Sequence, residues 1–198
     1  MSARTETFDA AYYDRYYRNR RTRVTSPATV AKLARFVTAY LDAIDVSVRT
    51  VADLGCGLGW WRDALAELVP KLDYRGVEFS DYLVEQCGWE HGSVVDWDSD
   101  RTFDLVICQG VLQYLPNADA ARALDNLSEL THGALYLEVL TKADWQQNVD
   151  RDRTDGKVWL RTARWYRQRL RPHFFECGGG VFVRRDSGIS LFELEHFG

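Results

Sequence analysis

The stretch DLGCGLG, at residues 53–59, constrains the fold of this chain more than any other part of the sequence. It follows RTVA and precedes the bulky pair Trp60 and Trp61, so it indicates a strand that turns through glycines into a helix. Glycines in such a turn permit positive φ and let the backbone approach a ligand closely. In a parallel α/β sheet, ligands bind where such turns lie, at the carboxyl ends of the strands. The stretch therefore predicts a ligand site at the edge of a parallel sheet.

The rest of the chain continues this alternation of short apolar runs and helical patterns, which is typical of βαβ units. We expect strands at about 49–55, 74–79, 92–96, 103–109 and 133–140. Helices are expected at 60–69, 81–87, 118–131 and about 162–170. Two final strand-like runs, 174–186 and 190–197, are separated by the turn-like pair Ser187-Gly188. The pattern predicts one α/β sheet with helices on both faces and a terminal hairpin.

The 198 residues, 46% of them hydrophobic, are enough for one packed domain. Within 1–198 we expect a helical N-terminal extension at 1–45, with Pro27 early in a helix, and a core at 46–198. No apolar run approaches the ~20 residues that span a bilayer, and the start lacks a signal peptide's apolar stretch, so we expect a cytoplasmic protein. The four cysteines lie far apart without metal-ligand spacing, so free thiols and no metal site are expected.

The spacing of the glycines narrows the choice of ligand. A dinucleotide fingerprint, G-x-G-x-x-G, needs a third glycine where this chain has Trp60. A phosphate loop, G-x-x-x-x-G-K-[ST], is also absent from the turn. The turn has the form G-x-G-x-G, which favours a ligand with little phosphate.

The segment VADLGCGLG resembles the first motif of the class I S-adenosylmethionine-dependent methyltransferases, an acid followed by G-x-G-x-G. Three further segments resemble motifs of that family in the same order: GVEFS at 76–80, GSVVDW at 92–97 and FDLVICQGVLQYLP at 103–116. The last is similar to the small-molecule branch. The resemblance implies a three-layer, Rossmann-like fold with a mostly parallel seven-stranded sheet. It also implies S-adenosyl-L-methionine as cofactor and methyl transfer to an O or N atom of a small molecule.

The resemblance further implies which residues bind the cofactor. Glu78, with Phe79 beside it, would hold both ribose hydroxyls, because one carboxylate can accept from two vicinal hydroxyls. Asp96 would contact the adenine amino group, with Trp97 beside the ring. Further contacts are expected from the glycine turn, the fourth strand and a tyrosine-bearing N-terminal lid: Asp53, Gly55, Cys56, Gly57, Gly59, Trp60, Gln109, Tyr12, Tyr13 and Tyr17.

Plainer roles stay open for several of these residues. Asp53 could only orient the turn, Asp96 could lie in a solvated loop, and Trp60 could simply pack on the sheet. The run AAYYDRYYRNRRTR, at 10–23, could be an amphipathic helix with a solvated arginine face.

Methyl transfer needs in-line positioning and exclusion of water, and it needs a base where the acceptor must lose a proton. A histidine base is not expected. The strand assignment puts His91, His132 and His173 at the amino edge of the sheet, away from the cofactor, and His196 in the last strand.

Candidate catalytic residues at the correct edge are Gln113 and Tyr114, which follow the fourth strand, and Glu138, near the end of the fifth. Glu138 stands out because a carboxylate in an otherwise apolar strand is costly unless it is partnered or functional. The alternative for Glu138 is an ion pair with an arginine or lysine.

A second basic stretch, at 157–171, follows the fifth strand, where related enzymes shape the acceptor pocket. Its aromatic residues and one before it could line that pocket: Trp145, Trp159, Trp165 and Tyr166. The two basic stretches permit an anionic substrate or RNA. The net charge of −4, and QGVL in place of the [DN]-P-P-[FYW] element of nucleic-acid methyltransferases, favour a small molecule.

Two hypotheses from other classes are kept. One is a non-catalytic S-adenosylmethionine-binding scaffold of the same fold. The other is a nicotinamide-dependent oxidoreductase, against which Trp60 argues.

Overall fold

The computed structural model of the chain describes residues 8–197, and its centre is a seven-stranded sheet of order β3-β2-β1-β4-β5-β7-β6. The strands are β1 Thr50–Leu54, β2 Asp73–Glu78, β3 Glu90–His91, β4 Phe103–Gln109, β5 Thr131–Glu138, β6 Phe174–Gly178 and β7 Val181–Arg184. The first five pair in parallel, while β7 pairs antiparallel with both β5 and β6. The expected fold class is confirmed.

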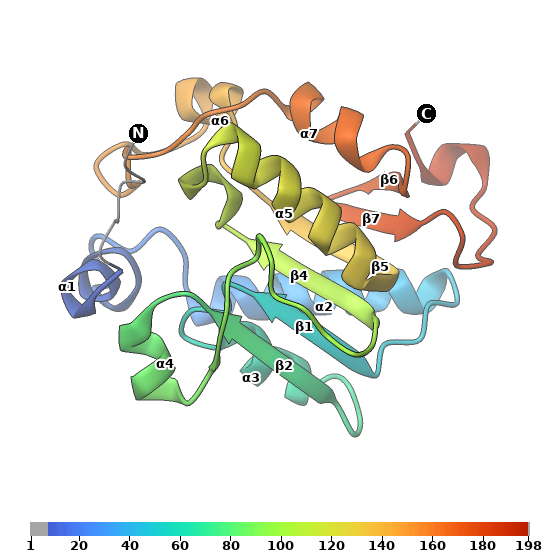
Figure 1. Ribbon diagram of the computed structural model, residues 1–198, viewed down its shortest axis with the longest axis horizontal. Coiled ribbons are helices and arrows are strands. Elements are labelled where there is room, and N and C mark those ends of the chain that lie inside the picture. The colour runs from blue at the N-terminus through green and yellow to red at the C-terminus, as the bar shows by residue number, and fades with distance from the viewer. Residues whose placement is uncertain (1–7, 198) are drawn as a thin grey trace.

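Helices cover both faces of the sheet and make three layers (Figure 1). On one face α2 (Pro27–Ala43) and α3 (Trp60–Ala66) bury Val37, Leu41 and Leu65 against β1 and β4. On the other face lie α5 (Asn117–Leu130) and α7 (Ala163–Leu170). The remaining helices are α1 Ala10–Tyr13, the π-helix η1 Asp14–Arg18, α4 Asp81–Cys87, η2 Leu112–Tyr114, α6 Lys142–Gln147 and η3 Glu193–Glu195.

The helix α2 begins as its sequence predicts. Ser26 is the N-cap and its Oγ accepts a hydrogen bond from the amide of Thr29 at 3.1 Å, while Pro27 occupies the first turn. Proline fits there because the first amides of a helix have no intrahelical acceptor.

The predicted third strand, 92–96, is wrong in position. The structure has a two-residue strand at 90–91, and the chain then turns, with the carbonyl of Ser93 accepting from the amides of Asp96 and Trp97. The Ser93 hydroxyl also accepts from the amide of Val95 at 3.2 Å. A serine that binds amides two to four residues ahead stabilises a turn in place of a strand.

The terminal hairpin is confirmed, but its turn lies earlier than Ser187-Gly188. The chain reverses at Gly178, Gly179 and Gly180, which all have positive φ, so β6 and β7 both fall inside the run 174–186. The run 190–197 contains η3 in place of the expected strand, and it meets the sheet through one bridge between Glu176 and Phe197.

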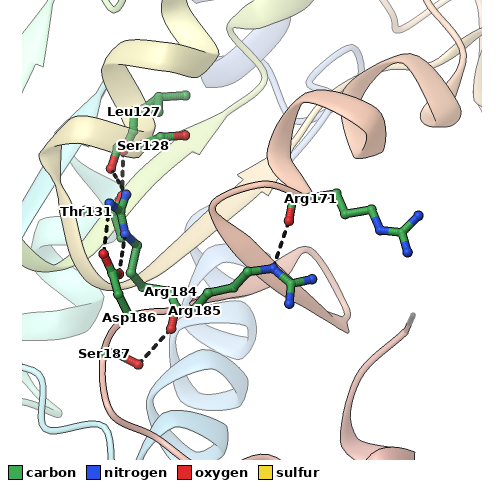
Figure 2. A network of polar contacts seen from close by, with 8 residues as sticks. All are labelled: Leu127, Ser128, Thr131, Arg171, Arg184, Arg185, Asp186 and Ser187. Carbon is green, nitrogen blue, oxygen red and sulfur yellow. Dashed lines mark hydrogen bonds and ion pairs between the residues drawn. The ribbon is translucent and has the colours of Figure 1, made fainter.

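Arginines tie β7 to the ends of two helices at the amino edge of the parallel strands (Figure 2). The Arg184 guanidinium donates to the carbonyl of Ser128, near the end of α5, and at 2.7 Å to the carboxylate of Asp186. Arg185 donates to the carbonyl of Arg171, just after α7, at 2.8 Å. Cationic side chains stabilise the carbonyl ends of helices, so these contacts attach the hairpin to α5 and α7. They lie at the edge of the sheet opposite to the carboxyl ends of the parallel strands.

The cysteines and the helix lengths bear on two further expectations. All four cysteines are free thiols, as expected. Among residues 8–197, no helix combines the length and the apolar character needed to cross a membrane.

Candidate functional site

A cavity of about 440 Å³ lies at the carboxyl edge of the sheet. Four groups of residues form it: the glycine turn, the segment after β4, the segment from the end of β5 through α6 to residue 155, and the N-terminal segment. Eleven sequence-predicted site residues line it: Tyr12, Tyr17, Asp53, Gly55, Cys56, Gly57, Trp60, Gln109, Gln113, Tyr114 and Glu138. Six others lie outside it: Tyr13, Gly59, Glu78, Phe79, Asp96 and Trp97.

The glycine turn requires glycine for two different reasons. Gly55 has φ +84, and a Cβ there would lie 2.4 Å from Cγ2 of Val111, so neither the conformation nor the space allows a side chain. Gly57 has φ +55, but a Cβ there would meet nothing within 4 Å. The main chain at Gly57 is therefore open to a ligand.

Glu78, at the end of β2, holds the turn in place. Its carboxylate is buried and accepts three backbone hydrogen bonds at 2.9 Å, from the amides of Gly57, Phe79 and Ser80. Burial raises the pKa of Glu78, and the three amides oppose that rise. A carboxylate offers about four lone-pair sites, so acceptor capacity is left for a further donor. Glu78, which the sequence predicts to bind the ribose, thus has a structural role in the turn.

Phe79, expected beside the ribose, and Asp96 and Trp97, expected around the adenine, lie apart from the cavity. Phe79 is 56% exposed and its ring stacks near that of His91, with 6.2 Å between ring centroids. Asp96 is exposed. Trp97 is buried in the core against Phe103, and its Nε1 donates to Glu90 at 2.7 Å. The ring of Trp97 therefore packs inside the protein.

The placement of His91 was wrong. It was expected at the amino edge of the sheet, but β3 ends at His91, which pairs with Glu78 at the carboxyl edge. The reason is the early strand end, since the turn at Ser93 follows directly. His91 Nε2 lies 3.4 Å from a carboxylate oxygen of Asp81.

Asp53 lies in β1, below the turn and at the base of the cavity. It is 1% exposed, and the Tyr74 hydroxyl donates to its carboxylate at 2.5 Å. Burial raises the pKa of Asp53 to about 7, against the lowering effect of the Tyr74 hydrogen bond. A role in orienting the turn and a contact with the ligand are thus compatible for Asp53, because Tyr74 fixes its carboxylate and the residue still lines the cavity.

Glu138 is held by neutral donors. The Trp61 indole donates to Gln109 Oε1 at 2.7 Å, which fixes the Gln109 amide so that its nitrogen donates to Glu138 at 3.1 Å. The Tyr136 hydroxyl donates to the same Glu138 oxygen, Oε2, at 3.0 Å. No arginine or lysine among residues 8–197 forms an ion pair with Glu138. The expected ion-pair alternative is therefore wrong for the described residues, and a negative charge faces the cavity.

Gln113 and Tyr114 face the cavity after β4. The Gln113 nitrogen donates to the carbonyl of Gly110 at 2.8 Å, and its buried Oε1 accepts no hydrogen bond from the described residues. The hydroxyls of Tyr114 and Tyr12 share a hydrogen bond at 2.8 Å. This bond joins the N-terminal segment to the segment after β4.

The N-terminal segment covers the carboxyl edge of the sheet (Figure 1). Tyr13 is buried beside Glu78, and burial, followed by the Glu78 charge, raises the pKa of the Tyr13 hydroxyl. The Tyr17 ring lies 5.9 Å from that of Trp60. None of the arginines between residues 15 and 23 lines the cavity. The segment thus places its tyrosines inward, as a lid does.

Arg161 is the structural residue of this region that sequence reasoning missed. Its guanidinium is buried and donates to the carbonyls of Leu112, Leu115 and Trp159, to the Tyr166 hydroxyl, and to Asn117. It joins η2 to the segment before α7. No signal in the sequence separates Arg161 from the other arginines of the stretch 157–171.

The four aromatic residues expected in an acceptor pocket do not line the cavity. They are Trp145, Trp159, Trp165 and Tyr166. The Arg161 Cζ lies 5.0 Å from the ring centroid of Trp165 and 6.0 Å from that of Tyr166. These two rings therefore pack on Arg161 and not on the cavity.

A family model described as "Methyltransferase domain" matches residues 15–185, which include all seven strands. The chain belongs to the methyltransferase-domain family. The resemblance to the class I S-adenosylmethionine-dependent enzymes is thereby confirmed, and so is S-adenosylmethionine as the cofactor that the family uses.

Curated relatives of this methyltransferase match part of the chain. A trans-aconitate 2-methyltransferase of Pseudomonas paraeruginosa is 29% identical over 89 residues, 41% of this chain and 32% of that protein. An uncharacterized protein of Rickettsia prowazekii, RP789, is 26% identical over 137 residues, 62% of this chain and 24% of that protein. The matches therefore span about a third or less of the relatives' own length.

Solved structures share the fold at low identity. The magnesium protoporphyrin IX methyltransferase of Synechocystis PCC 6803, with bound S-adenosylhomocysteine, is 17% identical with a TM-score of 0.64 over 89% of this chain and 96% of that one. A sugar N-methyltransferase of Streptoalloteichus sp ATCC 53650 is 19% identical with a TM-score of 0.64 over 93% and 96% of the two chains. These likenesses support the fold of the methyltransferase.

The residues present fit the family's cofactor. The open main chain at Gly57 offers a cradle that a side chain would fill, and Glu78 beside it keeps acceptor capacity. No lysine, arginine or histidine of the described residues lines the cavity, which suits the positive sulfonium of S-adenosylmethionine. Among those residues there is also no cluster of three side chains that could hold a metal ion.

Proposed function

We propose that this chain transfers the methyl group of S-adenosylmethionine to an O or N atom of a small-molecule acceptor. The observation that carries the proposal is the cavity, which joins the glycine turn to Gln109, Gln113 and Glu138 under a tyrosine lid. When bound, S-adenosylmethionine supplies a methyl group on positively charged sulfur, already activated toward a nucleophile.

The chain's own residues would then bind, orient and exclude water. The turn at Gly57 and the carboxylate of Glu78 hold one end of the ligand, and the lid residues Tyr12 and Tyr17 cover the cavity. Glu138, fixed by two neutral donors, is placed to accept a proton from an acceptor nucleophile. Positioning in such a closed site supplies much of the rate enhancement of a reaction between two bound groups.

A small acceptor suits the size of the cavity and the cover over it. A volume of about 440 Å³ lies in the usual range for small-molecule sites. Two structural neighbours, the magnesium protoporphyrin IX methyltransferase and the sugar N-methyltransferase, support the same class of acceptor. The anionic acceptor that the basic stretches permitted gains no support from a lining without described cations.

Two further assignments belong to the proposal. Residues 1–198 would form a single domain, with 1–45 as an N-terminal lid and extension and 46–198 as the core, because α2 packs in one core with β1 and β4. A cytoplasmic location suits the four free thiols, since reducing compartments keep cysteines unpaired.

Calorimetric titration tests the cofactor half of the proposal. The protein should bind S-adenosylmethionine and S-adenosylhomocysteine but not NAD. Glu78→Ala should weaken S-adenosylhomocysteine binding by about 1.5 to 3 kcal/mol, the usual worth of a hydrogen bond to a charged group. Glu85→Ala, an exposed change on the neighbouring α4, is the matched control and should bind as the original chain does.

Each outcome has a separate meaning. Since Glu78 also holds the turn, thermal unfolding of Glu78→Ala must show that the variant is folded at the titration temperature. A folded Glu78→Ala with undiminished affinity removes the ribose assignment. Absence of binding to both S-adenosyl compounds in the original chain overturns the proposed function, and binding without methyl transfer to any acceptor favours the scaffold hypothesis.

A further inference from the structure

Six of the residues that line the cavity have acidic or amide side chains. They are Gln109, Gln113, Glu138, Asp144, Asn148 and Asp155. Two arginines of the neighbouring loop are engaged elsewhere: Arg151 donates to the carbonyl of Trp145, and Arg153 pairs with Asp150 at 3.4 Å. The lining thus includes three carboxylates and no lysine, arginine or histidine of the described residues.

One of the three carboxylates is structural. Asp144 accepts from Thr141 and Asn148 as part of the capping box that begins α6, and these hydrogen bonds hold its pKa below the usual value. Its oxygens are occupied by neighbours on its own helix. The charge available to a ligand lies on the other two carboxylates, Glu138 and Asp155.

Glu138 and Asp155 reach the cavity from different elements and have capacity left. Both donors to Glu138 bind Oε2, and no hydrogen bond or ion pair from the described residues engages its Oε1. Asp155 is buried, and one of its oxygens accepts from the amide of Lys157 at 3.0 Å. The two carboxylates share a neighbour: both act electrostatically on the Tyr17 phenol, whose pKa rises to about 12, chiefly through burial.

Gln113 provides an independent sign that a ligand belongs here. The residue is 8% exposed, lines the same cavity, and leaves its Oε1 without a hydrogen bond from the described residues. Its nitrogen is committed to the carbonyl of Gly110, which fixes the amide with the oxygen as a free acceptor. A buried acceptor without a donor is costly, so an N–H or O–H group of a ligand would satisfy it.

Resting on the proposed function, we propose that the acceptor is an aliphatic amine whose ammonium group is bound by Glu138 and Asp155, with Gln113 Oε1 accepting a further N–H or O–H. An ammonium has three donors and no acceptor, which matches two carboxylates and an amide oxygen. A carboxylate or phosphate group would meet like charge at the same place and leave the Gln113 oxygen unsatisfied. Charge complementarity of this kind selects partners as well as strengthening binding.

The transfer balances with the groups present. The ammonium first loses one proton to Glu138, which is exposed enough to pass it to water. The nitrogen lone pair then forms the N–C bond to the methyl carbon, while the C–S bond breaks and its electron pair stays on sulfur. The nitrogen leaves as a methylated ammonium and the sulfur as a neutral thioether.

Three probes of one size and shape but different charge test the proposal: cyclohexylamine, cyclohexanol and cyclohexanecarboxylate. Binding of each to the full chain saturated with S-adenosylhomocysteine is measured by ligand-observed NMR at pH 7.5, where the amine is protonated because its pKa resembles that of lysine, about 10.4. We expect the amine to bind at least about tenfold more tightly than the carboxylate, since charge-assisted hydrogen bonds are worth this much or more.

Conservative variants assign the preference to residues. Glu138→Gln and Asp155→Asn should each lower amine affinity by about tenfold and leave cyclohexanol unchanged, because only the charge is removed. Glu129→Gln and Asp125→Asn, exposed changes on α5, are the matched controls and should behave as the original chain.

The results separate this inference from the proposed function. Equal or tighter binding of the carboxylate, an amine preference that both variants retain, or no binding of any probe overturns the inference while S-adenosylhomocysteine binding still stands. If S-adenosylhomocysteine itself does not bind, the proposed function fails. The charge preference is then measured on the chain alone, where the same three outcomes apply.

Discussion

At the residue scale, Asp53 shows how a ligand site costs stability. Its carboxylate is buried and accepts a hydrogen bond from the Tyr74 hydroxyl, and burial raises its pKa to about 7 from the ordinary value of 3.8. A group with a raised folded-state pKa stabilises the fold below its unfolded pKa and loses that contribution as pH rises through the folded value. The cost of the Asp53 charge therefore grows between about pH 4 and pH 7, the window set by these two values.

Asp53→Asn should remove this cost. The amide keeps an acceptor for Tyr74 and carries no charge, so the variant should unfold several degrees higher than the original chain at pH 7.5 and at nearly the same temperature at pH 4. Scanning calorimetry at the two pH values measures the difference. Asp125→Asn, an exposed change, is the control and should show no such pH dependence. A gain at pH 4 equal to that at pH 7.5 would contradict the role assigned to the Asp53 charge.

At the element scale, Arg161 replaces secondary structure as the link between distant segments. Its guanidinium donates to three carbonyls, a hydroxyl and an amide oxygen from separate segments. The fork of five donors in arginine is suited to this, and lysine, with three donors at one point, is not. The wall of the cavity after β4 therefore depends on one side chain from the segment before α7.

Arg161→Lys should lower the free energy of unfolding by at least about 2 kcal/mol, because several buried carbonyls lose their donors. Denaturation in urea measures it. Arg164→Lys, three residues on and exposed, should change stability by less than about 0.5 kcal/mol. S-adenosylhomocysteine affinity should stay the same in Arg164→Lys, since this exposed residue does not line the cavity. Equal stability of the two variants would show that the Arg161 hydrogen bonds do not hold η2 to the segment before α7.

The contrast between predicted and observed elements follows the range of the interactions that form them. Local patterns predicted α4 at its observed bounds, and β1, β2 and β4 within a residue or so, because runs of buried apolar residues and a serine cap can be recognised from neighbouring residues. The third strand was misplaced because the apolar residues after His91 lie in the turn that Ser93 stabilises. The turn at Gly178 was missed because the pairing of β6 with β7 decides where the hairpin reverses.

The site divides in the same way. The glycine turn and Glu78 were recognisable from motif spacing. The hydrogen bonds from Trp61 through Gln109 to Glu138 join three elements, and no local pattern encodes them.

At the scale of the whole molecule, the N-terminal segment from Phe8 to Arg23 is the proposed lid, and it is hydrogen-bonded to the segments that follow β2 and β4. Tyr12 bonds Tyr114 beyond β4, the Ser80 hydroxyl donates to the carbonyl of Phe8, and Arg18 donates to the Tyr82 hydroxyl at 3.0 Å. The arginines of the lid that follow Tyr13 face solvent in large part, which makes the segment a target for trypsin once it opens. A ligand beneath the closed lid would have to be admitted by that opening.

Binding should therefore protect the lid from cleavage. If S-adenosylhomocysteine binds only under the closed lid, a concentration of 100 times its Kd stabilises the closed state by about 2.7 kcal/mol, so trypsin should cut between residues 15 and 23 about a hundredfold more slowly. Mass spectrometry of timed digests locates and times the cuts. Tyr12→Phe, which loses the bond to Tyr114, should be cut faster without ligand and should still be protected by it. NAD at the same concentration should protect neither chain. Cleavage at an unchanged rate in saturating S-adenosylhomocysteine would mean that the lid does not close over the ligand. A ligand that binds only the closed state must lower the population of the open state, which trypsin cuts.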